Sequence, residues 1–341
     1  MDKEELESIF NKFTRVVEPV IEKTLVSNVD KKFQKLVEYP VLTGGKRIRP
    51  VLAIISCLMF GGKLKDVLYS AAGLEILHNY TLIVDDMIDD GTLRRGKPTC
   101  WFKFGNSIAQ CVGIDYAATI FQTANKSKNP SLISEIFART LKELGDGEIL
   151  DILFERVGRE KDPYVVKNRY KRVREKNYYE MISKKTAALF RTSCETGGIC
   201  AGAKGKELVA LRRYGFNLGM VFQITDDILD IFGEEKKFKK KIGKDIQERK
   251  EGNVVILLAL KAMEPDDRKK FLKIIEKKGK ITDNDIESGM KLIRKTDIHQ
   301  KAYQLGRQFA KEAKKSLSLL PQNKWNKILN DLVDYVLTRE K

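Results

Sequence analysis

The amino-acid sequence predicts an all-α protein, built as a single domain of roughly a dozen helices over residues 1–341. Apolar residues recur with the 3.6-residue period of amphipathic helices in one segment after another. The alternation of apolar and polar residues that is typical of strands is nearly absent. The chain has only 8 prolines and no low-complexity linker, and 42% of its residues are hydrophobic, which is enough for a sizeable core.

The N-terminal part is predicted to contain two helices joined by a glycine-containing loop. Residues 4–38 are charged and amphipathic, and we expect one long helix there. The sequence YPVLTGGKRIRP then leads to an apolar helix at residues 51–60. Gly44 and Gly45 allow a tight turn of the backbone in this loop, because glycine tolerates conformations closed to other residues.

Three cations, Lys46, Arg47 and Arg49, stand between these glycines and the apolar helix. Cations at a glycine-rich helix start favour an anion-binding site, because the free N–H groups of the first turn assist them. A basic surface loop without a ligand is the alternative interpretation.

A nearly all-apolar helix ends in a cluster of carboxylates within LEILHNYTLIVDDMIDDGTLRRGKP, residues 74–98. Asp85 and Asp89 share a helix face at i, i+4 spacing, and Asp86 lies beside them. Several acids at the negative end of a buried helix are unfavourable unless a positive charge joins them. Oxygen donors without Cys or His suit a hard cation such as Mg²⁺. A solvated helix end with spare acids is the alternative.

The segment FNLGMVFQITDDILDI, residues 216–231, repeats this arrangement with Asp226, Asp227 and Asp230. A second Asp-Asp-x-x-Asp on a second apolar helix is poorly explained as a chance surface cluster. We expect the two clusters to form two walls of one cavity, where divalent ions would clamp a diphosphate, neutralise it and help it leave.

The middle and the end of the chain are also predicted to be helical. Two apolar helices follow Trp101 and extend to about Ala124, and another is expected near residues 130–156. Residues 264–341 are predicted to close the bundle with amphipathic helices.

Two polar features interrupt this helical pattern. Within MISKKTAALF, the pair Lys185 and Thr186 lies on an otherwise apolar helix and needs polar partners. Residues 233–252 are the most polar part of the chain. They read either as a mobile surface loop or as a lid that brings lysines to a bound diphosphate, since such closures exclude water.

The composition limits the possible partners. A net charge of +17 fits nucleic acid, a membrane surface or a small anionic substrate. Basic residues occur among acids along the whole chain and no nucleic-acid-binding motif is present, so we expect no nucleic-acid partner. The N-terminus, MDKEELESIF, does not resemble a signal peptide, and the longest apolar run is too short to span a membrane. Five cysteines without a CxxC pair favour a reducing, cytoplasmic location.

Together, these motifs resemble those of the isoprenyl diphosphate synthases, also called trans-polyprenyl synthetases. DDMID with the following RRG resembles the first aspartate-rich motif of the family, and FQITDD resembles the second. GGKRIRP and KT complete the set, in the expected order over nearly the whole chain. The resemblance implies the isoprenoid synthase fold, in which helices surround a central apolar cavity. It is greatest to archaeal-type geranylgeranyl and farnesyl diphosphate synthases.

The resemblance implies a head-to-tail condensation of isopentenyl diphosphate with an allylic diphosphate (dimethylallyl, geranyl or farnesyl). It implies two or three Mg²⁺ ions, for which Mn²⁺ could substitute, held by Asp85, Asp86, Asp89, Asp226, Asp227 and Asp230. The implied catalytic residues are Asp85, Asp86, Asp89, Lys185, Thr186, Gln223 and Asp226. The implied substrate-binding residues are Lys46, Arg49, His78, Arg94, Arg95, Lys185, Thr186, Gln223, Lys241 and Lys250.

Further roles follow from the same resemblance. Arg47 matches a variable basic position, and Asp245 is a plausible acid beside the metal ligands. Gly147, Glu148 and Asp151 resemble a segment that lines the cavity in the family.

Product length is predicted from the helix that carries the first aspartate cluster. Tyr80 lies five positions before Asp85, about 7–8 Å along the helix by its rise per residue. Its ring could form a floor beneath the growing chain, beside the smaller Thr81 and Leu77; a tyrosine that only packs against a neighbouring helix is the alternative. An aromatic residue here resembles enzymes that make the twenty-carbon geranylgeranyl diphosphate. Farnesyl and geranylfarnesyl diphosphate are the alternative products.

Other functions fit the motifs less well. A terpene cyclase has no second substrate and needs no GGKRIRP site. Non-catalytic subunits of heteromeric prenyl synthases tend to lose one aspartate cluster, whereas both are intact in this sequence. The family resemblance also implies a homodimer, formed through the helices after the first motif.

Overall fold

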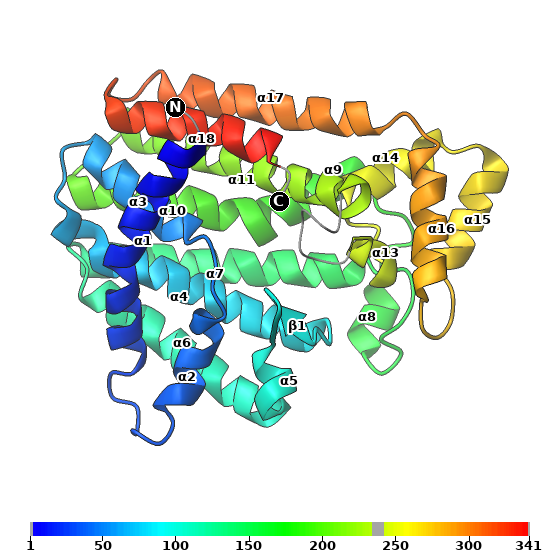
Figure 1. The fold of residues 1–341 in the computed structure, drawn as a ribbon, viewed down its shortest axis with the longest axis horizontal. Coiled ribbons are helices and arrows are strands. Elements are labelled where there is room, and N and C mark those ends of the chain that lie inside the picture. The colour runs from blue at the N-terminus through cyan, green and yellow to red at the C-terminus, as the bar shows by residue number, and fades with distance from the viewer. Residues whose placement is uncertain (1–2, 234–241, 340–341) are drawn as a thin grey trace. The chain divides into compact units, whose positions relative to one another are not determined.

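The computed structural model describes residues 3–233 and 242–339, and helices make up most of them (Figure 1). Within these two ranges, extended pairing is confined to one antiparallel hairpin and an isolated bridge between Glu155 and Lys250. The hairpin pairs β1 (Leu93–Arg94) with β2 (Lys97–Pro98). The all-α prediction is therefore confirmed.

The chain divides into two compact units, each assembled from segments that are distant in sequence. The first unit comprises Met1–Leu144, Ala188–Asn217 and Glu312–Tyr335. The second unit comprises Gly145–Ala187, Leu218–Lys311 and Val336–Lys341. Four long helices contribute to both units: α7 (Pro130–Leu153), α11 (Lys206–Phe232), α17 (His299–Leu317) and α18 (Lys324–Thr338).

The first unit is organised around two helices that are buried along most of their length, α3 and α10. Its other complete elements pack around them. The helices that lie wholly in this unit are α1 (Lys3–Leu25), α2 (Gln34–Leu42), α3 (Ile48–Met59), α4 (Leu64–Ile88), α5 (Cys100–Phe104), α6 (Asn106–Asn125) and α10 (Ala188–Ala201). A Cβ on Gly197 of α10 would lie 2.1 Å from the carbonyl oxygen of Ala53 on α3, so only glycine allows these two backbones to approach so closely.

Helix α4 is buried because other helices cover it on several sides. It packs against α1, α3, α6 and α10. This arrangement explains its nearly all-apolar sequence, which has no single hydrophobic face.

The prediction of one helix over residues 4–38 was wrong. Helix α1 ends at Leu25, and α2 begins only at Gln34. Between them Asn28 adopts a left-handed backbone conformation with φ of 66°. Asparagine tolerates this conformation because its side chain can hydrogen-bond to nearby backbone, so the Ser-Asn-Val-Asp stretch ends the helix despite the continuing amphipathic pattern.

The second unit contains shorter elements beside the ends of the long helices. Those that lie wholly in it are α8 (Pro163–Asn168), α9 (Glu175–Ile182), the π-helical turn η1 (Ser183–Ala187), α13 (Lys244–Gln247), α14 (Val254–Ala262), α15 (Pro265–Ile275) and α16 (Asp283–Arg294). Asn253 caps α14, since its side-chain oxygen accepts hydrogen bonds from the N–H groups of Val255 and Ile256. Single π-helical turns are rare and frequently mark functional sites, and η1 carries the Lys185–Thr186 pair.

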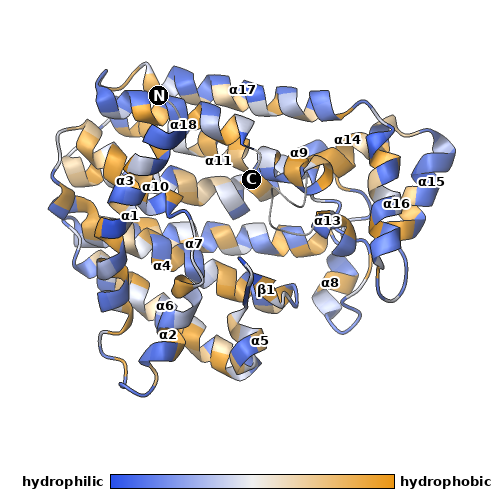
Figure 2. Ribbon diagram, viewed as in Figure 1, coloured by the Kyte–Doolittle hydropathy of each residue, from blue (hydrophilic) through white to orange (hydrophobic). Residues whose placement is uncertain are grey.

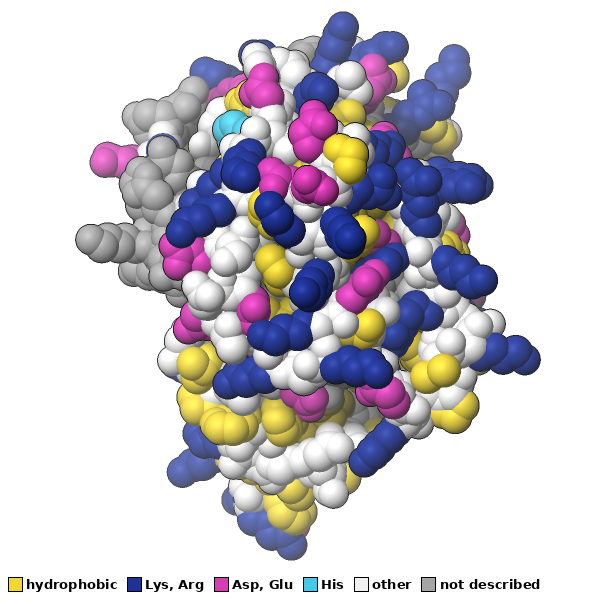
Figure 3. Space-filling view, turned by 90° about the vertical axis from the view of Figure 1, so that its right-hand side faces the viewer, with side chains coloured by type: hydrophobic (Ala, Val, Ile, Leu, Met, Phe, Trp, Pro, Cys, Tyr) yellow, Lys and Arg dark blue, Asp and Glu magenta, His cyan; other side chains and the backbone are white. Residues whose placement is uncertain are grey.

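The hydropathy pattern follows the burial of these elements. Figure 2 shows mainly hydrophobic residues in α14 and mainly hydrophilic residues over α15 and α16. On the face shown in Figure 3, Lys and Arg side chains are spread widely, with Asp and Glu among them. This interspersed distribution is typical of a solvated surface. Every helix in the described ranges is too short or too polar to cross a membrane.

Candidate active site

The first aspartate cluster lies in the last turn of α4, where the sequence predicts it. Asp85 and Asp86 belong to the helix, and Asp89 is its C-cap residue. Asp86 is buried, with 7% of its surface exposed. Acids at this end of a helix oppose the helix dipole, so their charge needs a nearby cation.

Arg94 supplies that cation in this structure. Its Nε lies 2.9 Å from each carboxylate oxygen of Asp86, and its terminal nitrogen donates to Asp85 at 2.8 Å. Burial lowers the pKa of the Arg94 guanidinium, but the hydrogen bond to Asp86 and the charges of both aspartates outweigh this effect and raise it. The sequence-predicted arginine and the sequence-predicted acids are therefore brought together by the β1–β2 hairpin.

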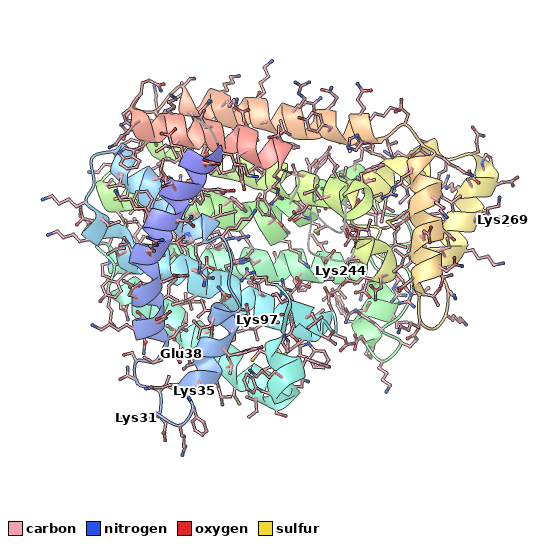
Figure 4. All side chains as sticks on the ribbon, in the orientation of Figure 1. Lys31, Lys35, Glu38, Lys97, Lys244 and Lys269 are labelled. Atoms are coloured by element: carbon pink, nitrogen blue, oxygen red, sulfur yellow. The ribbon has the colours of Figure 1, made fainter. Side chains whose placement is uncertain are left out.

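The same hairpin brings Arg95 to the glycine-rich loop. The Arg95 guanidinium donates a hydrogen bond to the carbonyl oxygen of Gly44. Gly45 has a φ of 136°, a conformation that favours glycine, and a Cβ there would lie within 2.9 Å of that guanidinium, which would have to shift. Lys97, labelled in Figure 4, strengthens this contact by donating from Nζ to the carbonyl oxygen of Leu42 at 2.9 Å.

The other predicted anion-binding residues lie in the same unit, on aromatic faces. The Lys46 ammonium lies 5.9 Å from the ring centroid of Tyr335, and the Arg49 guanidinium lies 4.9 Å from that of Phe190. Burial and the positive charge of Arg49 and neighbouring arginines hold the pKa of His78 well below its ordinary value. His78 is therefore a neutral imidazole near neutral pH, next to a group of cations.

Arg47 has a structural role that the sequence did not reveal. It is buried, and it pairs with Glu75 at 3.0 Å and with Glu18 at 3.4 Å. Its other terminal nitrogen donates to the carbonyl oxygen of Val41 at 2.8 Å. A signal was present in the sequence, because Glu75 is an isolated acid in the apolar part of α4 and a buried acid needs a partner.

The predicted chain-length residues lie one to two turns before the first cluster. Leu77 is fully buried, whereas Tyr80 is only partly buried. A Cβ on Gly113 of α6 would lie 3.6 Å from the Tyr80 ring, so α6 passes directly beside that ring. Thr81 donates a hydrogen bond to the carbonyl oxygen of His78 and so uses its hydroxyl within α4.

The second cluster lies near the end of α11, and each of its three aspartates has a different environment. Asp226 is partly exposed, and it accepts a hydrogen bond at 2.6 Å from Arg339. The Arg339 guanidinium also lies 3.8 Å from the ring centroid of Phe222 and donates to its carbonyl oxygen. The sequence does not predict Arg339 as a site residue, because nothing near it in the chain indicates its partner.

Asp227 is buried and accepts hydrogen bonds at both carboxylate oxygens. The Tyr178 hydroxyl donates to Oδ2 at 2.8 Å, and the N–H of Val254 donates to the same oxygen at 2.9 Å. The side-chain amide of Gln223 donates to Oδ1 at 2.9 Å. Tyr178 was not predicted as a site residue, since it has no sequence feature that separates it from the adjacent Tyr179.

Asp230 is bound to the start of α13. It accepts hydrogen bonds from the backbone N–H of Lys244, labelled in Figure 4, at 3.0 Å and from that of Asp245 at 3.2 Å. Asp245 in turn accepts a hydrogen bond from the side-chain amide of Asn253 at 2.7 Å. Burial, followed by the charge of Asp245, raises the pKa of Asp230 to about 8.

The residues of this cluster fit a divalent cation. Burial raises the pKa of Asp227 and of Asp245 as well as that of Asp230, which means that their ionised forms lack sufficient positive charge nearby. Within residues 3–233 and 242–339, no group of three or more His, Cys, Asp or Glu side chains is gathered closely enough to hold a metal by itself. Mg²⁺ ordinarily combines one or two carboxylates with water and substrate phosphates.

The predicted lysines of the second unit share one acid. Lys185 lies 2.7 Å and Lys250 lies 2.9 Å from the same oxygen of Asp151. Lys185 also pairs with Glu148 at 2.8 Å. Burial alone would raise the pKa of Asp151, but the two ammonium groups lower it to about 2. The other predicted lysine, Lys241, lies outside the described residues.

The backbone geometry of η1 depends on a glycine of α7. A Cβ on Gly147 would lie 2.3 Å from the backbone nitrogen of Lys185, so α7 and η1 are in direct backbone contact. Thr186, also on η1, donates a hydrogen bond to the side-chain carbonyl oxygen of Gln223 at 2.7 Å. Thr186 and Gln223 are thus joined directly, whereas the ammonium of the adjacent Lys185 pairs with Asp151 and Glu148.

The chain is similar to known proteins over most of its length. The family model described as Polyprenyl synthetase matches residues 30–293. The geranylgeranyl diphosphate synthase of Saccharolobus solfataricus is 33% identical over 349 residues, covering 100% of both chains. Component 2 of the heptaprenyl diphosphate synthase of Bacillus subtilis is 32% identical over 324 residues, covering 94% of this chain and 87% of that protein.

The fold is also shared with solved structures. The crystal structure of geranylgeranyl pyrophosphate synthetase from Pyrococcus horikoshii matches with a TM-score of 0.87 and 28% identity, over 98% of this chain and 99% of that chain. The all-α isoprenoid synthase fold expected from the sequence is therefore confirmed. The chain belongs to the polyprenyl synthetase family, and it is a prenyltransferase.

Proposed function

We propose that this prenyltransferase condenses isopentenyl diphosphate with an allylic diphosphate, and that its main product is the twenty-carbon geranylgeranyl diphosphate. Farnesyl and geranylfarnesyl diphosphate are the competing products. The similarity to a geranylgeranyl diphosphate synthase supports the first choice, whereas the similarity to a heptaprenyl diphosphate synthase component keeps longer products in consideration.

The observation that carries this proposal is the position of Arg95. Its guanidinium lies against the Gly44–Gly45 turn, in the same unit as Lys46 and Arg49. We assign isopentenyl diphosphate to these cations, with the neutral imidazole of His78 beside them. A terpene cyclase has a single substrate and no use for a second group of cations near the first aspartate cluster.

The aspartate clusters would hold the metal ions. Asp85, Asp86 and Asp89 of the first cluster, with Asp226 and Asp230 of the second, provide the oxygen donors that Mg²⁺ prefers. When bound, Mg²⁺ supplies charge neutralisation that makes the allylic diphosphate a better leaving group. Arg94 now binds Asp85 and Asp86, and we expect it to turn to the diphosphate oxygens when the metal takes these carboxylates.

The protein's own groups would then guide the carbon chemistry. The bond between C1 of the allylic substrate and the diphosphate oxygen breaks, and the diphosphate leaves with both electrons. The double bond of isopentenyl diphosphate attacks C1, and a proton leaves C2 of the new unit for the departed diphosphate. Thr186 and Gln223 present preorganised dipoles to the developing positive charge, and Lys185 and Lys250 bind the diphosphate. No separate general base is then required.

We assign the floor of the product site to Tyr80. Its ring is partly buried on α4 and lies beside Gly113 of α6. A growing apolar chain that reaches this ring would stop. Thr81 and Leu77 are smaller, and they would limit the length of the product only if the Tyr80 ring were absent.

We also propose a homodimer formed through α6. Ile114 and Phe121, spaced i, i+7, are exposed on one side of this helix, and Ile108 of α6 and Leu132 of α7 are also exposed. Exposed apolar side chains that share a helix face favour a protein–protein contact. The molar mass from light scattering tests the dimer, and Ile114→Lys should yield monomers.

All five cysteines are free thiols, which supports a reducing location such as the cytoplasm.

The reaction is tested by incubating the purified protein with Mg²⁺, isopentenyl diphosphate and each allylic primer in turn, and then sizing the products by chromatography. A twenty-carbon product that lengthens in Tyr80→Ala supports both the reaction and the floor. Tyr69→Ala, on the same helix but farther from the aspartates, is the matched control and should leave the product length unchanged. Absence of product with every primer would contradict the proposal and favour a non-catalytic subunit, which would form product only when mixed with a partner chain.

A further inference from the structure

We propose that Tyr178 and Asp227 are positioning residues that fix the orientation of the Gln223 side-chain amide, so that its carbonyl oxygen and the Thr186 hydroxyl oxygen are held ready for the developing allylic cation. This inference rests on the proposed function and deepens it. It also gives Asp227 a different role from the direct metal ligation that the sequence suggests.

The four side chains form one continuous chain of hydrogen bonds. Tyr178 donates to Asp227, Gln223 donates to Asp227, and Thr186 donates to Gln223, over distances of 2.8, 2.9 and 2.7 Å. The four residues come from α9, α11 and η1, and all four lie in the second unit. Each link is well within the range of a normal hydrogen bond.

The direction of the bonds determines which way the amide points. The backbone N–H of Val254 can only donate, and it occupies Oδ2 of Asp227 together with the Tyr178 hydroxyl. Oδ1 accepts from Nε2 of Gln223. The amide nitrogen therefore faces Asp227, and the amide oxygen must face the opposite way, toward Thr186. With its proton used in this bond, the Thr186 hydroxyl presents lone pairs, rather than a proton, to any ligand beside it.

Burial makes this orientation rigid. Tyr178 is fully buried, 3% of Asp227 is exposed, and 8% of Thr186 is exposed. Buried polar networks whose members are all satisfied hold their side chains in one arrangement, because breaking any bond leaves an unpaired group in a low-dielectric site. Dipoles that are already aligned need no reorganisation when charge develops in the transition state, which is the main source of electrostatic catalysis.

The neighbouring aspartate provides a contrast within the same cluster. The Asp226 side chain is 37% exposed and pairs with Arg339, so it is accessible to an incoming metal ion. Asp227 has both oxygens occupied by the three donors described above. The two adjacent acids are therefore suited to different tasks, Asp226 to metal binding and Asp227 to orientation of the amide.

The first test compares Tyr178→Phe with Tyr179→Phe. Tyr178→Phe removes one hydroxyl and keeps the ring, and we expect kcat to fall about ten-fold with KM for both substrates nearly unchanged, since loss of such a supporting hydrogen bond typically costs 10- to 100-fold. Tyr179 lies outside this hydrogen-bond chain and packs against Phe309, so Tyr179→Phe should retain kcat. Equal kcat values in the two variants would overturn the inference.

The second test measures binding instead of turnover. An ammonium analogue of the allylic diphosphate mimics the cation, and its neutral carbon isostere does not. By calorimetry, we expect Tyr178→Phe to weaken the ammonium analogue about ten-fold and the isostere hardly at all. Equal weakening of both compounds would indicate a general structural defect and would overturn the positioning role.

The third test separates positioning from metal binding. Asp226→Asn should weaken Mn²⁺ binding, measured by titration in the presence of inorganic diphosphate, whereas Asp227→Asn should retain it. If both variants lose Mn²⁺ to the same extent, Asp227 is a metal ligand and the inference fails. Absence of product from the unmodified enzyme would overturn the proposed function, whereas product formation together with an unchanged kcat in Tyr178→Phe would overturn this inference alone.

Discussion

The guanidinium of Arg94 spans the carboxylate of Asp86, with its Nε 2.9 Å from both oxygens. This pair neutralises the end of α4, where the helix dipole and three carboxylates would otherwise repel one another. The arginine thus supplies positive charge that the carboxylates need when no metal ion is bound to them.

Removal of this arginine should make the stability of the protein depend on Mg²⁺. We expect Arg94→Ala to lower the free energy of unfolding by about 2 kcal/mol without metal, which is less than for a fully buried pair because Arg94 is partly exposed. Added Mg²⁺ should raise Tm more in this variant than in the unmodified enzyme. Lys97→Ala, on the same hairpin, is the control for scanning calorimetry, and an identical Mg²⁺ response in both variants would contradict the prediction.

His78 should make the protein less stable in mildly acidic solution. Its pKa in the folded state is well below 6.5, because of burial and the nearby arginines, whereas the unfolded chain has the ordinary value. Below pH 6.5 the unfolded state therefore binds a proton that the folded state does not, and stability falls by up to about 1.4 kcal/mol per pH unit. Urea unfolding at several values between about pH 5 and pH 7 should give the free energy of unfolding as a function of pH. Its slope should be smaller in His78→Gln and unchanged in His299→Gln.

Asp151 should stabilise the folded protein, and this contribution should be lost in acid. Its pKa is about 2 in the folded state and 3.8 ordinarily, because Lys185 and Lys250 offset its burial. The contribution, about 2 kcal/mol, is fully present above pH 3.8 and disappears as the pH falls toward 2. Asp151→Asn should therefore destabilise the protein at neutral pH and lose this part of the acid dependence. Asp146→Asn, at a more exposed acid of the same helix, should behave like the unmodified protein.

Two glycines of α7 should respond to alanine in opposite ways. At Gly147 a Cβ would lie 2.3 Å from the Lys185 backbone, so Gly147→Ala should cost about 1–3 kcal/mol of stability and lower kcat by shifting η1. At Gly145 nothing lies within 4 Å of such a Cβ, so Gly145→Ala should be neutral or add up to about 1 kcal/mol through helix propensity. Thermal unfolding of the two variants decides the matter, and equal Tm values would exclude a specific contact between α7 and η1.

Much of the active site could be predicted from the sequence because its signals are local. The carboxylates at Asp85–Asp89 require a cation wherever α4 packs, and Arg94 follows them within one short hairpin. The break after Leu25 was missed, since an amphipathic pattern can continue through a turn.

Periodicity, charge and motif spacing within the sequence determined the all-α class, the two aspartate-rich helices and the cationic loop, because each depends on residues a few positions apart. The tertiary structure alone decided which buried polar groups meet. Tyr178 donates a hydrogen bond to Asp227, 49 positions away in the sequence. Arg339 donates to Asp226, 113 positions away, and Arg47 donates to Glu75, 28 positions away. These partnerships arise from helix packing, since a buried donor must take whichever acceptor the fold places beside it.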